Sequence, residues 1–336
     1  MDFSDIKINL DIPRTMTLDG LRYLGALART VPEGGTIVEI GPLYGSSTWV
    51  LSKNAHPSVR IVSIDTWEPQ DWIPRRLPEA PAFGLDAFRA FVADCPNVEP
   101  IQGFSPACVQ GWSDRVDLIF DDATHGDPGF SENINFFLPH LREGGIVCGD
   151  DFASGWPDII RVVKKLATDW GTWPEVAGRV WAINKFGAKS GHDTVYERLP
   201  GRTGGDLYLE AEMASGTRIA TPPNVWCGAL HGNDTILALG ARRADGTDPG
   251  VRVQGQYADG RETPLMDLAA GARFDAPLAN IRFELAEGAA REHPLSYQAT
   301  EVDPVTGKSM NTATARAGAW IQTGREGTVI SGIRLN

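Results

Sequence analysis

Residues 36–48 read Thr-Ile-Val-Glu-Ile-Gly-Pro-Leu-Tyr-Gly-Ser-Ser-Thr, and this stretch decides the fold. An apolar run ends in a turn that holds Gly41 and Gly45, and serine and threonine then open a helix. A strand, a tight loop and a helix N-terminus in this order form the ligand crevice of open α/β sheets, although an ordinary strand-to-helix turn is the alternative. The stretch is not a dinucleotide fingerprint, because G-x-G-x-x-G would need glycine at Leu43 and Ser46.

The length and composition of the chain limit what it can be. With 336 residues it exceeds the usual size of one domain, so two domains are expected. A net charge of −12 argues against a non-specific grip on nucleic acid or on an anionic membrane. No apolar run reaches the ~18–20 residues of a membrane span, and the acidic N-terminus has no apolar signal segment. The four cysteines form no C-x-x-C pair, so neither a zinc knuckle nor a disulfide framework is indicated, and we expect a cytoplasmic protein.

In the first half of the chain, strand and helix signals alternate. After a helical run over residues 17–28, strands are expected at Thr36–Ile40, Arg60–Asp65, Val98–Gln102, Val116–Asp121 and Gly145–Cys148. Helices are expected at Ser46–Asn54, Leu85–Ala93, Asp127–His140 and Asp158–Trp170. Repeated βα units of this kind form a doubly wound parallel sheet with helices on both faces. A β signal at residues 175–185 supplies a last pair of strands, which can run antiparallel.

A change of sequence period marks the second half. Residues 189–205 are rich in glycine and polar side chains and are interpreted as a linker. Beyond them apolar and polar residues alternate, turn signals separate the runs, and no long helical pattern intervenes. We therefore predict a Rossmann-like domain over residues 1–188 and an antiparallel β-sandwich over residues 206–336. Aromatic side chains of this half form either a carbohydrate platform or part of the core: Trp226, Tyr257 and Trp320.

The chemistry of an open α/β sheet lies at the carboxyl ends of its strands. The second strand ends at Asp65, which Thr66 and Trp67 follow. An acid here can accept hydrogen bonds from a ribose diol, and a tryptophan can offer a face to an adenine ring. A helix cap or a surface acid is the alternative. After the third strand, the small Gly103 and the hydroxyl of Ser105 suit the lining of an adenine site.

Two acidic pairs end neighbouring strands. Asp121 and Asp122 close the fourth strand, Asp150 and Asp151 follow the fifth, and His125 lies between the pairs in sequence. Carboxylates that converge on one crevice repel one another, and a bound cation removes that repulsion. Carboxylate oxygens are ligands that Mg²⁺, Ca²⁺ and Mn²⁺ prefer. Helix capping is the alternative role for these acids.

These segments resemble a known family. The spacing of Glu39, Gly41 and Gly45 resembles the E-x-G-x-x-x-G loop of class I S-adenosylmethionine-dependent methyltransferases. The segments at residues 118–125, 138–146 and 150–152 look like the I-D-G-D/H, P-x-L-x-x-G-G and aspartate-pair motifs of macrocin-type sugar O-methyltransferases. The resemblance covers roughly residues 30–185 and implies that S-adenosylmethionine is the methyl donor.

By this resemblance Asp122 takes the place of the first metal-ligand aspartate, and Asp150 with Asp151 that of the second acidic pair. The chain departs from the family pattern at Thr124, where macrocin-type enzymes carry a second acid thought to act as base. His125 is similar in position to the histidine of D-x-x-H relatives and is predicted as the substitute base, with a structural hydrogen bond as the alternative. Mg²⁺ is the first expectation for the cation.

A proline-rich loop over residues 67–81 contains two tryptophans and two arginines. Aromatic faces suit sugar rings and arginines suit carboxylate or phosphate groups, so the loop is interpreted as a lid over the acceptor. Packing at the sheet edge or a dimer contact is the alternative. Trp156 is expected to form another wall of the acceptor pocket.

The functional prediction is an S-adenosylmethionine-dependent O-methyltransferase that acts with a divalent metal on a hydroxyl of a sugar or glycan-type acceptor. Catalysis is assigned to His125 and Asp122, and metal binding to Asp122, Asp150 and Asp151. The competing class is a non-catalytic glycan- or protein-binding module on a degenerate methyltransferase fold; a nicotinamide-dependent dehydrogenase lacks its glycine fingerprint. Oligomer formation stays open. The residues predicted to bind the donor are Glu39, Gly41, Tyr44, Gly45, Ser46, Asp65, Thr66, Trp67, Gly103, Ser105 and Asp121.

Overall fold

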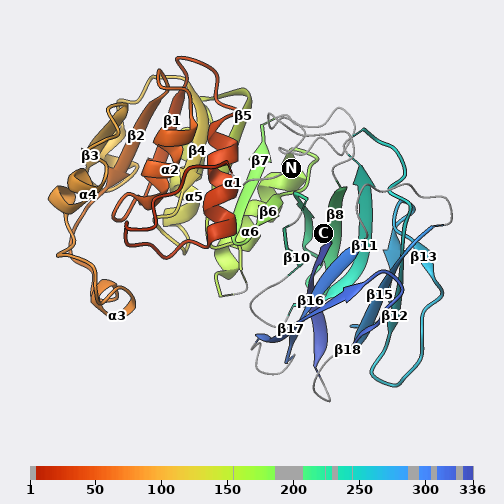
Figure 1. Ribbon diagram of the computed structural model, residues 1–336. Helices are drawn as coiled ribbons and strands as arrows, with labels where there is room; N and C mark the ends of the chain where they lie inside the picture. The colour runs from red at the N-terminus through yellow and green to blue at the C-terminus, as the bar shows by residue number, and fades with distance from the viewer. Residues whose placement is uncertain are drawn as a thin grey trace.

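The computed structural model of the protein combines an α/β half with a second half made of strands (Figure 1). It describes residues 5–153, 155–185, 207–223, 225–228, 234–243, 245–286, 295–303, 309–322 and 328–335. The expected linker at residues 189–205 lies outside this part of the chain. Among the described residues, no helix is long and apolar enough to cross a membrane.

The α/β half is built around five parallel strands in the spatial order β5-β4-β1-β2-β3. The strands are β1 (Thr36–Ile40), β2 (Arg60–Asp65), β3 (Val98–Gln102), β4 (Val116–Asp121) and β5 (Leu141–Gly149). The hairpin of β6 (Glu175–Ala177) and β7 (Val180–Asn184) continues the sheet, with β7 antiparallel to β5. The expected doubly wound arrangement, including the antiparallel last pair, agrees with this topology.

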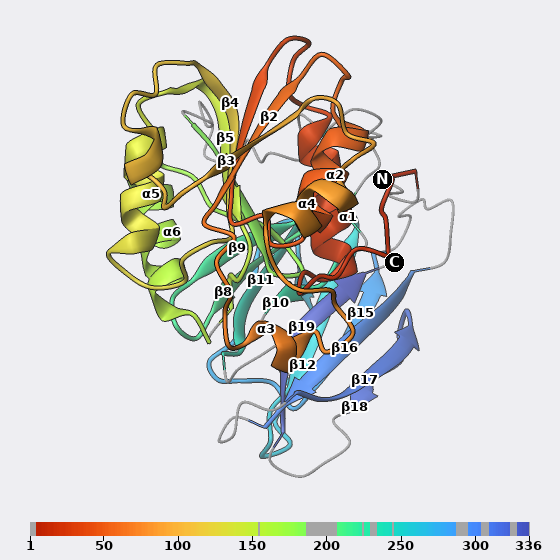
Figure 2. The ribbon, with the colours of Figure 1, turned by 90° about the vertical axis from the view of Figure 1, so that its left-hand side faces the viewer.

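Helices cover both faces of this sheet, because alternate residues of each strand point to opposite sides. Ile37 packs in one core with α1 and α2, whereas Val38 packs in another core with α5 and α6 (Figure 2). The helix α1 begins where the Thr17 side chain accepts a hydrogen bond from the Gly20 amide, a capping arrangement that satisfies a free N–H. The helices are α1 (Leu18–Ala28), α2 (Ser46–Asn54), α3 (Ile73–Arg76), α4 (Leu85–Phe91), α5 (Gly129–Phe137) and α6 (Pro157–Asp169), with a 3-10 turn at Ala107–Val109.

The sheet does not stop at β6 but crosses into the second half of the chain. Strand β9 pairs in parallel with β6 through Glu175 and Ala220, and further antiparallel pairs extend the sheet to eleven strands. The junction is buried, and there the Tyr23 hydroxyl donates a 2.5 Å hydrogen bond to the Glu175 carboxylate. The strands added here are β8 (Leu207–Met213), β9 (Arg218–Thr221), β11 (Ile236–Arg243) and β14 (Ala272–Arg273).

Two further antiparallel sheets of four strands each complete the second half. They pack on one another and on the long sheet in a shared apolar core, in which the Phe283 and Tyr297 rings lie 4.9 Å apart. Tyr257 is buried in this core rather than open to a ligand. One sheet contains β10 (Cys227–Gly228), β19 (Val329–Leu335), β16 (Ser296–Val302) and β17 (Ser309–Arg316); the other contains β13 (Met266–Asp267), β12 (Val251–Gln256), β15 (Asn280–Leu285) and β18 (Ile321–Gln322).

Candidate functional site

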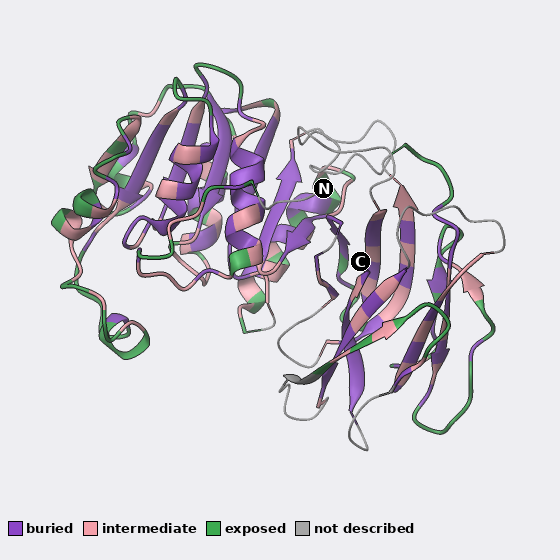
Figure 3. Cartoon of the chain, in the orientation of Figure 1, coloured by how far each residue is buried: buried purple, intermediate pink, exposed green. Residues whose placement is uncertain are grey.

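A cavity of about 500 Å³ lies at the carboxyl ends of β1, β2, β3 and β4. This is the edge at which ligands bind in open α/β sheets, and the volume falls in the usual range of small-molecule sites. The strands β1, β2 and β4 are largely buried, whereas the edge strand β3 is partly exposed and the loop with α3 is mostly exposed (Figure 3). Its lining includes Thr15, Gly41, Asp65, Thr66, Trp72, Arg76, Gly103, Phe104, Ser105, Asp122, His125, Asp151 and Trp156.

The loop after β1 forms one wall of the cavity and rests against the end of β4. The Gly41 amide donates to the Ile64 carbonyl at 2.9 Å, and the Asp122 amide donates to the Ile40 carbonyl at 2.9 Å. Gly41 has φ +81°, and a Cβ added to it would lie 2.6 Å from the Ala123 Cα. Glycine is therefore required here both by backbone conformation and by close approach.

Glu39, predicted to bind the donor, supports the loop from below instead of lining the cavity. It is fully buried, and its Oε2 accepts hydrogen bonds from Thr48 at 2.6 Å and Ser63 at 2.7 Å. Burial raises the pKa of this carboxyl, and the hydroxyl donors oppose that rise. The observed contacts give Glu39 the role of joining β1, β2 and α2.

Asp65 lines the cavity at the end of β2, as expected, and Thr66 lies beside it. Its Oδ1 accepts a hydrogen bond from the Trp67 amide at 2.9 Å, and burial raises its pKa. The Trp67 ring does not reach the cavity lining: it is 3% exposed and packs on Phe88 at 4.8 Å between ring centroids. The structure therefore brings the acid, but not the predicted aromatic face, to the site.

Three other predicted donor residues also lie behind the cavity wall. Tyr44 is buried and donates its hydroxyl proton to the Pro81 carbonyl at 2.7 Å, which holds the proline-rich loop. Gly45 and Ser46 form the start of α2 and do not line the cavity. By contrast Gly103 and Ser105, after β3, both contribute to the lining as expected.

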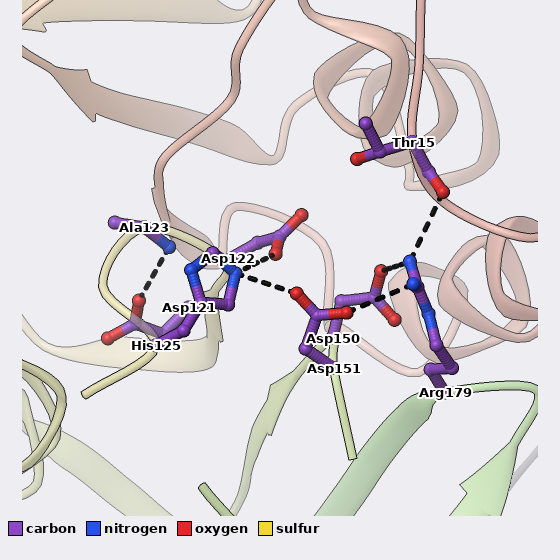
Figure 4. A network of polar contacts seen from close by, with 8 residues as sticks. All are labelled: Thr15, Asp121, Asp122, Ala123, His125, Asp150, Asp151 and Arg179. Carbon is purple, nitrogen blue, oxygen red and sulfur yellow. Dashed lines mark hydrogen bonds and ion pairs between the residues drawn. The ribbon is translucent and has the colours of Figure 1, made fainter. Parts of the chain in front are cut away.

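The ends of β4 and β5 bring two carboxylates and an imidazole together (Figure 4). The His125 Nε2 atom lies 2.7 Å from Asp151 Oδ2 and 3.5 Å from Asp122 Oδ1. The His125 ring also stacks on Trp156, with 4.5 Å between the ring centroids. Trp156 lines the cavity beside this cluster.

Charges inside the cluster shift its pKa values in opposite directions. Burial by itself would lower the pKa of His125, but hydrogen bonds to Asp122 and Asp151 and their charges raise it to about 10. Burial raises the pKa of Asp122 to about 8, and the charges of Asp150 and Asp151 add to that rise. Burial would also raise the pKa of Asp151, but His125 and Arg179 outweigh it and hold this pKa below its usual range.

Arg179, which the sequence analysis did not single out, completes the network. It lies in the turn between β6 and β7 and donates to Asp150 Oδ2 at 2.8 Å, and it pairs with Asp151 Oδ1 at 3.1 Å (Figure 4). A further bond of 3.1 Å reaches the Thr15 carbonyl of the N-terminal arm. The sequence indicated that a positive charge must balance the second acidic pair, and a metal ion was expected there. It did not indicate that the Arg179 side chain supplies a positive charge.

Two predicted acids thus have partners other than a ligand. Asp150 is buried against Arg179, so it does not join the group of possible cation ligands formed by Asp122, His125 and Asp151. Asp121 is 2% exposed, its Oδ1 accepts the Ala123 amide at 3.1 Å, and burial raises its pKa to about 7. It shapes the turn after β4 and does not line the cavity.

The cavity has two polar regions, one at the end of β2 and one at the end of β4. Asp65 at the end of β2 can accept hydrogen bonds from a polar ligand, and Asp122 at the end of β4 can accept a proton near neutral pH. The backbone of Gly41 lies between them in the cavity wall. Such a site can hold one ligand at the second strand and present another to the acidic cluster.

Comparison with known families agrees with this class of site. Residues 38–152 match the model of a family described as a methyltransferase domain. The match runs from β1 to the residue after the second acidic pair, so it contains the loop of Gly41 and the cluster around His125. This part of the chain therefore matches a methyltransferase domain, which agrees with the Rossmann-like fold expected from the sequence. No curated protein matches the sequence of the chain.

Several solved structures are similar to this chain at a distance. One is the apo TDP-rhamnose 3′-O-methyltransferase of calicheamicin biosynthesis: 17% identity, 49% of this chain and 77% of that chain, TM-score 0.37. Another is the O-methyltransferase TomG from Streptomyces achromogenes in complex with SAM, which is 21% identical over 51% of this chain and 82% of that chain, with a TM-score of 0.37. A third is a precorrin-6Y C5,15-methyltransferase from Geobacter metallireducens, which is 17% identical over 53% of this chain and 97% of that chain, with a TM-score of 0.40. These similarities are too low to bear on substrate or mechanism.

Proposed function

We propose that the protein is an S-adenosylmethionine-dependent O-methyltransferase that acts on a hydroxyl of a sugar or another polyhydroxylated acceptor. The observation that supports this most is the shared cavity, which Asp65 lines at one strand end and Asp122, His125 and Asp151 at another. The methyltransferase family match covers the strands that carry both groups. One pocket can therefore hold a methyl donor and an activated hydroxyl together.

On the donor side, Asp65 is the residue proposed to accept hydrogen bonds from the ribose hydroxyls. Gly103 and Ser105 would line the adenine site, since both reach the cavity after β3. The methionine moiety would lie along the loop at Gly41, where the absence of a side chain exposes the backbone. Glu39 would act indirectly by fixing this loop.

On the acceptor side, Asp122 is proposed to take the proton of the hydroxyl. In this geometry His125 already carries a proton near neutral pH, because its pKa is raised to about 10, and it is hydrogen-bonded to Asp151. Asp122 has a pKa of about 8, so its ionised fraction can act as general base, and the rate of methyl transfer should rise as the pH increases toward 8. Asp122 and His125 lie close enough for their protonation states to depend on each other. In this proposal His125 positions Asp122, and the cavity aligns the acceptor hydroxyl with the methyl group of the donor.

The cluster also fits a divalent cation, as predicted from the sequence. The donor atoms of Asp122, His125 and Asp151 all lie within 4.8 Å of one another, and two carboxylates with an imidazole suit Mn²⁺ better than Mg²⁺. Binding would require His125 to release its proton, so the ion would replace Asp122 acting as a free base. When bound, such an ion would polarise the acceptor hydroxyl and lower its pKa. Asp150 would contribute through Arg179 rather than as a ligand, in place of the three-aspartate set expected from the sequence.

The donor half is tested by titration calorimetry with S-adenosylhomocysteine. Asp65→Asn should weaken binding by about tenfold or more, because it removes a charged acceptor from the cavity, whereas Asp86→Asn on the exposed side of α4 should leave it unchanged. Absence of binding to the unaltered protein would contradict the proposed function. Titration with Mn²⁺ tests the cation separately: Asp122→Asn should abolish an uptake that the exposed variant Asp86→Asn retains.

For the second half of the chain, we infer that the two four-stranded sheets form a β-sandwich beside the extension of the long sheet. The division into residues 1–188, a linker at 189–205 and residues 206–336 belongs to the same proposal. A role in binding glycans would suit a sugar-modifying enzyme. Screening the full chain on a glycan array tests it, and an array without signal would remove that role.

A further inference from the structure

The one-turn helix α3 divides its side chains between two environments. Ile73 is 4% exposed and packs with Ile12 and Tyr44 in a small core, on which Leu77 also packs. Trp72 and Arg76, one helical turn apart, line the cavity instead. Figures 1 and 2 show α3 at the end of a long loop, clear of the sheet and of the larger helices. Ile73 thus anchors α3 to the protein, and Trp72 and Arg76 on the other side of the helix are open to a ligand.

Arg76 is the one lysine or arginine that lines the cavity in the described part of the chain. Its guanidinium forms no ion pair and no hydrogen bond with any residue that the structure describes, and only its backbone amide is bonded, to the Trp72 carbonyl. His125, in contrast, lies between two carboxylates. A guanidinium presents a planar fork of donors that matches carboxylate or phosphate oxygens, so a cavity that holds an unpaired one is suited to an anion.

Exposed aromatic side chains accompany Arg76 in the lining. Trp72 is 36% exposed on α3, and Phe104 is 60% exposed after β3. Large exposed aromatic groups that line a cavity offer apolar faces for a ring-bearing ligand. The lining of this region thus combines one unpaired guanidinium with apolar faces, whereas the carboxylates of Asp122 and Asp151 lie beside His125 and Arg179.

We propose that the acceptor of the methyl group is an anionic polyol whose carboxylate or phosphate binds Arg76. Its ring would pack against Trp72 and Phe104, and its reacting hydroxyl would reach Asp122. The cationic groups near Asp122 and Asp151 are already paired with carboxylates, so Arg76 is the positive group left for the charge of the acceptor. This assignment rests on the proposed function and narrows it from sugars in general to acidic or phosphorylated sugars.

The neighbouring arginine provides a matched control. Arg75 lies on the same helix and is exposed like Arg76, but it does not line the cavity. Arg76→Gln and Arg75→Gln therefore remove the same charge one residue apart. Neither side chain is buried, so both variants should retain the fold.

The experiment measures binding of glucose, glucuronic acid and glucose 1-phosphate to the protein saturated with S-adenosylhomocysteine. We expect at least one of the two anionic sugars to bind about tenfold or more tightly than glucose, Arg76→Gln to abolish that preference, and Arg75→Gln to retain it. The carboxylate and phosphate arms tell which anion is preferred. Equal binding of all three sugars, or equal losses in both variants, would overturn the inference.

A separate titration with S-adenosylhomocysteine distinguishes this failure from failure of the proposed function. If S-adenosylhomocysteine does not bind, the methyltransferase proposal itself fails. If it binds the unaltered protein but Arg76→Gln loses that binding, the anion at Arg76 is the carboxylate of the donor. That outcome would overturn the inference about the acceptor and leave the proposed function intact.

Discussion

At the scale of single residues, the strand ends could be predicted but the partners of their side chains could not. Asp65, Asp122 and Asp151 all reach the cavity, because the carboxyl ends of neighbouring strands meet at one edge. Trp67 follows Asp65 directly, yet its ring turns away to pack on Phe88. Arg179 lies 28 residues beyond Asp151 in a turn, and no sequence spacing indicates that their side chains meet.

Removal of Arg179 should destabilise the protein strongly. Arg179→Gln leaves the buried carboxylate of Asp150 without its cation, and such a loss costs about 3 kcal/mol or more. Arg161→Gln is the control, because Arg161 pairs with Asp127 and Asp158 at the surface, where ion pairs contribute less than about 1 kcal/mol. Urea unfolding of the two variants measures the difference, and equal losses would mean that Arg179 is dispensable for holding the acidic pair.

His125 should make the stability of the protein depend on pH in a defined window. Its folded pKa of about 10 lies above the unfolded value near 6.5, so its stabilising contribution is full below pH ~6.5 and is lost as the pH rises through 10. In EDTA, the free energy of unfolding of the unaltered protein should exceed that of His125→Gln more at pH 6 than at pH 10. A difference that stays constant over this range would show that the imidazole does not gain a proton on folding.

At the scale of elements, apolar runs that end before a polar or glycine-rich turn predicted β1, β2 and β4 well, and β3 was found although its sequence is Val-Glu-Pro-Ile-Gln. Strand β5 is an exception: it begins at Leu141, earlier than the expected Gly145. The apolar run begins only near Gly145, but Leu141 pairs with Val116 and a register shift absorbs the irregularity. Pairing across the sheet thus extends the strand beyond its apolar run.

The loop between β1 and α2 should tolerate no side chain at Gly41. Gly41→Ala combines a left-handed backbone with a Cβ 2.6 Å from Ala123, whereas Gly34→Ala has a similar φ of +72° but open space around it. Gly34→Ala should cost about 1 kcal/mol from conformation alone, and Gly41→Ala should cost about 2 kcal/mol more. Chemical denaturation compares the two. Equal costs would indicate that the loop shifts freely away from β4.

At the scale of the whole molecule, the change of period at residues 189–205 predicted a second, all-β half. The described strands beyond this segment agree with that expectation. The sequence could not reveal that β9 would pair with β6, because this contact joins residues far apart in the chain and buries Glu175 with Tyr23. Because the two halves share a sheet and an apolar core, unfolding one half would expose buried surface of the other.

The full chain should therefore unfold in one thermal transition. Differential scanning calorimetry should give a single peak, because an apolar core continues from β1 through the second half. S-adenosylhomocysteine should raise the temperature of this peak as a whole, since it binds only the folded state. Two separate peaks, of which the ligand moves only one, would show that the halves fold independently.

The pairing of β6 with β9 also bears on how copies of the chain meet one another. An unpaired strand edge is a template for non-native association, and proteins suppress it by covering the edge. Here β9 occupies part of the β6 edge, and β8, β11 and β14 carry the sheet onward. A proteolytic cut that released the second half would leave β6 uncovered. By covering part of this edge, the second half limits the non-native strand pairing open to the first half.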